Sequence, residues 1–171
     1  MHDGYIFTIG ICGSTGGLAP TCLDAMLAAL PPVKRAALLG EVLLSEGAPD
    51  LHDPLVEPIR ADIADAELLL IVTPVLGTAL PTRLYELARR VIITPPPTRP
   101  RHALLVILGQ CDEAALTPLR HLCAAAEARI VSELWVKDED TLSDEQRKQL
   151  EYLTRAAYEI ARGLVPEALP Q

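Results

Sequence analysis

The chain has 171 residues, half of them hydrophobic, which is enough for one substantial core and short for two domains. Its 23 acidic and 15 basic residues give a formal net charge of -8, and an acidic surface repels the phosphate backbone of nucleic acids. The longest apolar run, Leu68–Val72, is far below the ~20 residues that cross a membrane, and Met1-His2-Asp3 begins no export signal, so we expect a cytoplasmic protein.

The first elements predicted along the chain are a strand, a glycine-rich loop and a helix. Apolar and β-branched residues fill Gly4–Cys12, and Gly13-Ser14-Thr15-Gly16-Gly17 ends that strand. Thr21-Cys22-Leu23-Asp24 then has the pattern of a capped helix start. Hydroxyls and unhindered N–H groups at a helix N-terminus favour a phosphate group. The open alternative is a turn that only joins strand to helix.

The loop is distinct from two common nucleotide-binding patterns. It does not have the G-x-G-x-x-G spacing of a dinucleotide site, and it lacks the Lys of a nucleotide-hydrolysing G-x-x-x-x-G-K-[ST] loop. The sequence therefore supports neither a dinucleotide fingerprint nor an NTPase at this position.

The next segments predict two strands with a helix between them. Residues 36–44 are apolar but interrupted by Gly40-Glu41, and we read them as a strand. Apolar residues at helical spacing predict a helix over Asp50–Ala66. Pro58 would cost a hydrogen bond inside that helix, so a start at Pro58 is the open alternative. Glu67–Pro74 is almost continuously apolar, which is typical of a central parallel strand covered on both faces.

A second loop and a further helix follow that strand. The loop covers Pro74–Leu80, and Pro81 suits the first position of a helix. Apolar residues at helical spacing form one stripe of this helix, namely Leu84, Leu87, Ala88 and Val91. This stripe is either part of the core or an interface between subunits.

The C-terminal half repeats the alternation of strands and helices. A proline-rich connector, 94–101, leads to a strand over His102–Leu108, the loop Gly109-Gln110-Cys111-Asp112 and a helix to about Ala128. Arg129–Val136 forms the fifth strand. Ser143-Asp144-Glu145-Gln146 is a capping box for a last helix that ends near Gly163.

Five strands separated by helices predict a five-stranded, parallel, doubly wound α/β sheet with helices on both faces, in one domain over residues 1–171. Ligands of such sheets bind beyond the carboxyl ends of the strands. The loops after the first, third and fourth strands are therefore the candidate site. Groups in Thr73–Gly77 and Gly109–Asp112 are placed to meet the edge of a planar heteroaromatic ring, although ordinary loop structure is the alternative for both.

Several segments together resemble NADPH-dependent FMN reductases, most closely the alkanesulfonate-associated ones. They are Gly13-Ser14, the helix start at Thr21, Asp53-Pro54, Leu69–Val75, Gly77–Pro81 with Leu84, and Ala115-Leu116-Thr117-Pro118-Leu119. The resemblance covers nearly the whole chain in consistent order. It implies a flavodoxin-like three-layer sandwich that binds FMN, accepts hydride from NADPH or NADH, and assembles as a homodimer or homotetramer.

The resemblance also implies roles for individual residues. Ser14, Thr15 and Thr21 would hold the FMN phosphate, and the adjacent Gly16 and Cys22 belong to the same cofactor-binding set. The isoalloxazine ring would be flanked on one side by Pro74, Val75, Leu76 and Gly77, and on the other by Gly109, Gln110 and Cys111. No catalytic side chain is implied, since the protein's part in flavin chemistry is orientation and hydrogen bonding.

Two positions depart from the family's pattern. Many members have an Arg where this chain has Gly16, and a Tyr where it has Leu76. Both departures predict weaker flavin retention. The alternatives to a reductase of diffusible FMN are an FMN-holding reductase of quinones, azo compounds or metals, a flavodoxin-like electron carrier, and a flavin-free interaction module.

No metal site is predicted. The four cysteines form no C-x-x-C pair and the four histidines are scattered singly. Cys111 is the one candidate nucleophile, but Asp112 beside it is expected to raise its pKa. Asp138-Glu139-Asp140 reads as a solvated acidic turn.

Overall fold

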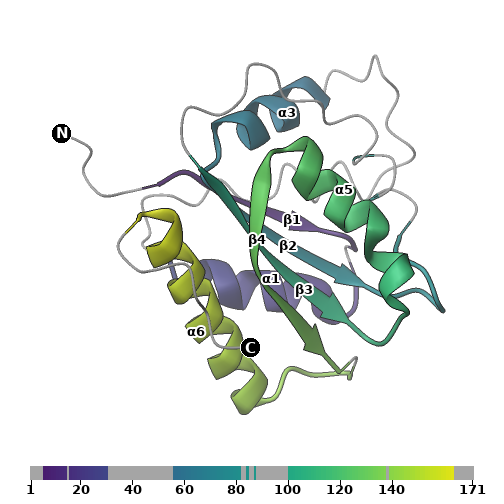
Figure 1. Cartoon of the computed structure of the whole chain (residues 1–171). Helices are drawn as coiled ribbons and strands as arrows, with labels where there is room; N and C mark the ends of the chain where they lie inside the picture. Colours follow the sequence, from purple (N-terminus) through teal and green to yellow (C-terminus); the bar gives the residue numbers. More distant parts are fainter. Residues whose placement is uncertain are drawn as a thin grey trace.

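A parallel sheet forms the centre of the molecule (Figure 1). The computed structural model describes residues 6–14, 16–30, 56–81, 84, 87, 100–137 and 139–163. The sheet contains, in spatial as well as chain order, β1 (Thr8–Cys12), β2 (Leu68–Pro74), β3 (Arg101–Leu108) and β4 (Ala128–Val136). All three pairings are parallel. The expected strand over 36–44 lies outside the described residues, so four of the five predicted strands are described.

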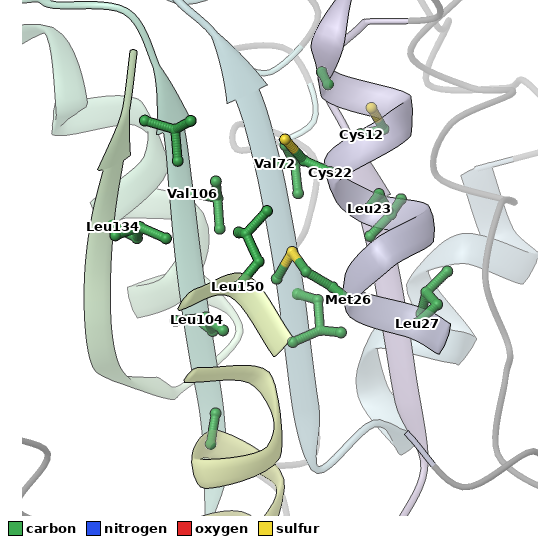
Figure 2. Packing of buried hydrophobic residues seen from close by; sticks show 14 of the residues in the cluster. Cys12, Cys22, Leu23, Met26, Leu27, Val72, Leu104, Val106, Leu134 and Leu150 are labelled. Carbon is green, nitrogen blue, oxygen red and sulfur yellow. The ribbon is translucent and has the colours of Figure 1, made fainter. Parts of the chain in front are cut away.

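Helices cover both faces of this sheet, as the alternating sequence pattern predicted. The helices are α1 (Leu18–Ala28), α3 (Val56–Asp65), the short η2 (Glu113–Leu116), α5 (Thr117–Ala125) and α6 (Asp144–Ala161). One buried cluster joins the sheet to α1 and α6 (Figure 2), and a second joins the other face to α3 and α5. This three-layer arrangement is consistent with a flavodoxin-like fold.

The central strands have the residue patterns expected from their positions. β2 and β3 each pair with a strand on both sides, and nearly all of their residues are buried. Strands covered on both faces lose the alternation of apolar and polar residues, which explains the run Leu68–Val72. β4 is an edge strand of the described sheet, and most of its residues are only partly buried.

The ends of the helices test the sequence prediction most closely. The capping box of α6 is confirmed: the Ser143 side chain accepts from the Gln146 N–H at 3.1 Å, and the Gln146 side chain accepts from the Ser143 N–H at 2.8 Å. Gly163 follows that helix with a φ of 74°, a conformation that favours glycine. α3 is described from Val56, two residues before Pro58, so the helix does not start at this proline.

The predicted start of the first helix is wrong. α1 begins at Leu18, with Gly17 as its N-cap residue at a φ of 72°, and Thr21 is already inside the helix. Pro20 lies in the first turn, where the N–H that proline lacks would have no partner within the helix. The positive φ of Gly17, which glycine adopts without strain, allowed the chain to enter the helix earlier than the capping pattern indicated.

The stripe that the sequence left open between core and interface is core where it is described. Leu84 and Leu87 are fully buried and pack in the same cluster as α3 and α5. Ala88 and Val91 lie outside the described residues.

Candidate functional site

Three loops meet at the carboxyl edge of the sheet, where the strand arrowheads lie in Figure 1. Main-chain hydrogen bonds connect each loop to the neighbouring strand. Gly13 donates to the Val72 carbonyl at 2.7 Å, Val75 donates to Leu108 at 2.8 Å, and Gly109 donates to Val136 at 2.9 Å. The loops after β1, β2 and β3 therefore form one continuous edge, as the sequence predicted.

Gly13 shows how closely the first loop approaches the end of β2. A Cβ atom at this position would lie 2.7 Å from Thr73 Oγ1 and 3.1 Å from Leu84 Cδ1. Such distances leave no room for a side chain, so glycine is required for the packing and not only for the turn. The start of the predicted phosphate loop is consequently fixed against β2 and the residues that follow it.

Hydrogen bonds within the first loop shape its path. The Ser14 hydroxyl accepts from the Gly16 N–H at 3.2 Å and donates to the Gly16 carbonyl at 3.1 Å. The Cys12 thiol donates to the Ser14 carbonyl at 2.9 Å. Thr15 lies outside the described residues.

The N-terminus of α1 has the properties of an anion site. Its N-cap, Gly17, contributes no side-chain hydrogen bond within the described structure, and no acidic residue lies in the first turn. The first N–H groups of a helix carry a partial positive charge and need acceptors. Exposed Thr21 lies one turn further along α1.

Cys22 does not face this loop with its side chain. It is fully buried in the cluster between α1 and the sheet (Figure 2), and burial raises the pKa of its thiol to about 11, with Cys12 acting in the same direction. The side chain thus packs in the core and is shielded from any ligand at the loop.

The second loop is a tight turn after β2. Leu76 and Ala79 exchange main-chain hydrogen bonds of 2.7 and 3.2 Å around Gly77, whose φ is 67°. The N–H groups of Val75 and Leu76 are thereby used within the protein, and Pro74 has none. The main-chain hydrogen bonds between described residues include none from the N–H groups of Gly77, Thr78 and Leu80 in this loop. The Leu76 side chain is 61% exposed.

The third loop follows β3 and contains the remaining predicted residues. Gly109 has a φ of 105°, Gln110 is exposed, and Cys111 is partly buried against the core cluster of α5. Burial, and then the Asp112 carboxylate, raise the pKa of Cys111. The thiol form is favoured, so the nucleophilic role that the sequence left as a candidate gains no support.

A pocket of about 800 Å³ lies beside this third loop. Its lining combines the predicted residues Gly109, Gln110 and Cys111 with three residues at the end of β4, namely Trp135, Val136 and Lys137. Sequence reasoning did not assign those three. The available signal was the single tryptophan of the chain, followed two residues later by a lysine at the end of a strand.

Other site types receive no support from the described part of the chain. No group of three or more His, Cys, Asp or Glu residues there is arranged to hold a metal ion. All four cysteines are described, and none forms a disulfide. Among the described helices, none has both the length and the apolar character needed to traverse a bilayer.

Comparison with known proteins shows the fold. No protein-family model and no curated sequence matches the chain. A solved flavone reductase aligns with a TM-score of 0.73 at 12% identity, covering 92% of this chain and 63% of the reductase, so the chain spans less than two thirds of that protein. At such identity the likeness concerns the fold alone.

Two further structures extend that likeness over nearly their full lengths. FerB, described as a flavoenzyme NAD(P)H:(acceptor) oxidoreductase from Paracoccus denitrificans, has a TM-score of 0.64 at 13% identity and covers 93% of this chain and 98% of its own. General stress protein 14 from Treponema denticola, solved in complex with FMN, has a TM-score of 0.58 at 15% identity and covers 93% of this chain and 99% of its own. The chain therefore shares its fold with flavin-dependent oxidoreductases.

Proposed function

We propose that this chain is an NAD(P)H-dependent flavin reductase that binds FMN in one domain, across the loops after β1, β2 and β3. The observation that carries the proposal is the close packing of the first loop on the end of β2, where Gly13 lies against Thr73. Because Thr73 directly precedes the second loop, we infer that a phosphate at the N-terminus of α1 and a ring at the second loop belong to one ligand. The fold shared with FMN-binding and NAD(P)H-dependent proteins supports the same function.

The residues at this edge fit the chemistry of FMN. The N-terminus of α1 and the exposed hydroxyl of Thr21 suit a phosphate, because they supply donors without an acidic side chain in the first turn. The Ser14 hydroxyl would exchange its bond to the Gly16 carbonyl for one to the phosphate. The N–H groups of Gly77 and Thr78 suit the polar edge of the ring. When bound, FMN supplies the capacity to accept hydride from a nicotinamide. The protein orients the ring and excludes water from one side of it.

Two exposed positions favour FMN as an exchanging substrate over a permanently held group. The space around Gly16 is open, and no cation occupies this position to pair with a phosphate. Leu76 projects from the second loop as an aliphatic side chain that offers no aromatic stacking. We accordingly propose an enzyme that binds FMN reversibly, works in the cytoplasm and forms a homodimer or homotetramer, which light scattering would detect.

An FMN titration followed by NADH and NADPH oxidation assays tests this function. We expect colourless protein after dialysis, saturable FMN binding, and nicotinamide oxidation only when FMN is added. Protein that stays yellow after dialysis would instead identify an FMN-holding reductase or an electron carrier. Protein that neither binds FMN nor oxidises nicotinamide would refute the proposal and favour an interaction module.

Ser14→Asp tests the phosphate loop directly. A carboxylate at this position would repel the phosphate, so we expect the Kd for FMN to rise at least ~10-fold, equivalent to about 1.4 kcal/mol. Ser143→Asp is the matched control, because it adds the same charge at the N-terminus of α6, where aspartate also caps a helix. Equal FMN affinities for the two variants would remove the first loop from the site.

A further inference from the structure

Thr73 is a polar residue near the end of an otherwise apolar strand. It follows the run Leu68–Val72 in β2, and its side chain is fully buried. A buried hydroxyl costs free energy unless it is hydrogen-bonded, and this one donates to the Pro74 carbonyl at 3.1 Å. Because the side chain has no exposed surface, it does not reach a ligand at the sheet edge. Any effect of Thr73 on binding therefore acts through its neighbours.

The acceptor of this bond belongs to a peptide group that is held at both ends. The Pro74 carbonyl accepts from the Thr73 hydroxyl, and the Val75 N–H of the same peptide group donates to the Leu108 carbonyl at 2.8 Å. Because a peptide group is planar, these two bonds together fix its rotation. The second loop leaves β2 through this group, so the direction of the chain toward Gly77 is set there.

Thr73 also lies against the start of the first loop. A Cβ atom on Gly13 would lie 2.7 Å from the Thr73 hydroxyl oxygen and 3.1 Å from the Thr73 Cβ. Gly13 in turn donates to the Val72 carbonyl at 2.7 Å. One side chain thus packs beside the backbone that opens the first loop and is hydrogen-bonded to the backbone that opens the second.

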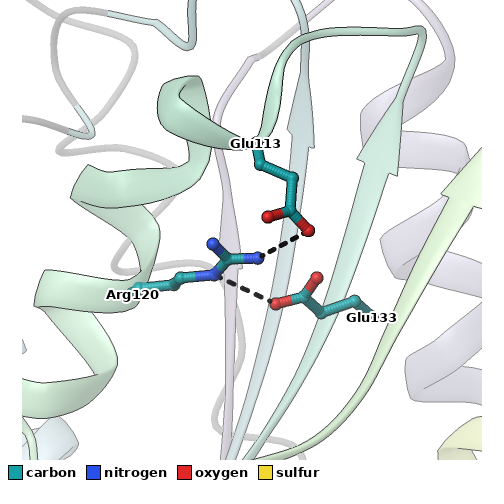
Figure 3. Close-up of polar contacts among 3 residues, drawn as sticks. All are labelled: Glu113, Arg120 and Glu133. Carbon is teal, nitrogen blue, oxygen red and sulfur yellow. Dashed lines mark hydrogen bonds and ion pairs between the residues drawn. The ribbon is translucent and has the colours of Figure 1, made fainter.

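The third loop is held by a bridge of a different kind. Arg120 of α5 lies 3.5 Å from Glu133 of β4 and 3.8 Å from Glu113, which follows this loop (Figure 3). These side chains are partly or largely exposed, and exposed ion pairs contribute little because water competes for the same groups. The Thr73 hydroxyl is buried, so its bond is the better-defined constraint on a loop of the site.

We propose that Thr73 is a positioning residue of the flavin site, whose hydroxyl fixes the direction of the second loop and so presents the Gly77 and Thr78 N–H groups to the flavin ring. This role rests on the flavin-reductase function proposed above. Without the bond, a smaller fraction of molecules holds the loop in the binding direction, and the apparent affinity falls by that fraction. Thr73 acts on the ring and not on the phosphate.

Thr73→Ser and Thr73→Ala test the bridge, because the two variants differ from each other only by the hydroxyl. In the full chain without flavin, NMR measures hydrogen exchange at the Val75 N–H. We expect exchange to be at least ~3-fold faster in Thr73→Ala than in Thr73→Ser. The Gly109 N–H, which donates to the Val136 carbonyl, is the reference and should exchange equally in both. Equal rates at Val75 would overturn the bridge.

Flavin titrations of the same pair test the positioning role. Riboflavin has the ring of FMN without its phosphate, so a change at the second loop affects both ligands alike. We expect the Kd values of Thr73→Ala for FMN and riboflavin to exceed those of Thr73→Ser by one common factor, at least ~5-fold. Ser14→Asp should raise the Kd for FMN alone. A loss confined to FMN in Thr73→Ala would place its effect at the phosphate and overturn the proposal.

Thr154→Ala is the matched control for a lost buried hydroxyl. Thr154 is also fully buried, and its hydroxyl donates to the main-chain carbonyl of Leu150 in α6 at 2.7 Å. This variant should lose stability in urea without a change in the Kd for either flavin. Equal flavin affinities for folded Thr73→Ala and Thr154→Ala would overturn the role of Thr73 at the site.

The two experiments separate failure of this role from failure of the proposed function. A parent chain that binds neither FMN nor riboflavin would refute the flavin-reductase function. The exchange rates at Val75 are measured without flavin, so they would still decide whether the Thr73 hydroxyl fixes the second loop.

Discussion

The amino and carboxyl edges of the sheet differ in how their main-chain polar groups are hydrogen-bonded. At the amino edge, the buried guanidinium of Arg101 donates to the main-chain carbonyls of Ala64, Ala66 and Ala126, with the Nε bond to Ala66 at 2.6 Å. These carbonyls lie at the C-terminal ends of α3 and α5, just before the chain enters β2 and β4. One side chain at the start of β3 thereby satisfies groups from both neighbours.

At the carboxyl edge, the chain leaves donors available instead. Gly17 gives the N-terminus of α1 no side-chain cap, and the hydrogen bonds described for the turn around Gly77 are those from the N–H groups of Leu76 and Ala79. Four glycines of the described chain have positive φ, and three of them, Gly17, Gly77 and Gly109, lie in these loops.

Together with the proposed FMN site, the difference suggests a division in which the amino ends of the strands serve stability and their carboxyl ends serve binding. Buried polar groups cost free energy unless they are paired, so an edge dedicated to stability pairs them internally. An edge that binds a ligand leaves hydrogen-bond donors unpaired in the free protein, so these groups contribute less to the free energy of folding. Substitutions at the two edges should therefore have separable effects on unfolding and on FMN affinity.

The largest expected effect is on stability, from Arg101→Met at the amino edge. The variant keeps the unbranched shape of the side chain but leaves three carbonyls without their donor, so the free energy of unfolding should fall by about 3 kcal/mol or more. Urea denaturation measures this loss. Arg155→Ala is the control, since its exposed ion pair with Glu151 contributes at most about 0.5 kcal/mol.

The same Arg101 variant also tests whether the edges are separate. Under conditions where it remains folded, its Kd for FMN should equal that of the parent protein. A weakened FMN affinity in folded Arg101→Met would contradict the division between the edges.

Gly13→Ala should have the next largest effect, and it acts on both properties. The added Cβ would meet Thr73 and Leu84, and such overpacking typically costs about 1 to 3 kcal/mol. Displacement of the loop should also weaken FMN binding. Gly16→Ala is the matched control, because nothing lies within 4 Å of its added Cβ. Similar unfolding energies for the two alanine variants would show that the close approach at Gly13 is unimportant.

The smallest expected effect is a pH dependence at the amino edge. His102 is buried, and desolvation, with a smaller contribution from Arg129, lowers its pKa from the ordinary value of 6.5. The folded state therefore disfavours the protonated ring. This contribution to stability is complete above about pH 6.5 and is lost as the pH falls toward the lowered folded-state pKa.

His102→Gln isolates that contribution. Unfolding free energies of the parent and the variant, measured by urea denaturation from neutral to mildly acidic pH, should diverge as the pH falls. The parent should lose more stability than the variant over this interval. Parallel curves would show that His102 does not couple folding to protonation.

Much of the fold could be predicted from short sequence patterns, because strand burial and helix capping depend on residues close together in the chain. The apolar run of β2 predicted a buried central strand, and the reciprocal hydrogen bonds between Ser143 and Gln146 followed from a four-residue pattern. The three loops were predicted from topology alone, since parallel strands end at one edge. The start of α1 was wrong because a glycine N-cap leaves no side-chain signature.

The sequence by itself determined the alternation of strands and helices, the capping of α6 and the edge at which a ligand is expected. Only the tertiary structure decided which way Cys22 faces, which N–H groups of the second loop are already used, and that Trp135 and Lys137 line a pocket with Gln110. It also revealed the three carbonyls that Arg101 satisfies. The physical reason is that these properties depend on contacts between segments distant in the chain, whereas periodicity and capping depend on neighbours a few residues apart.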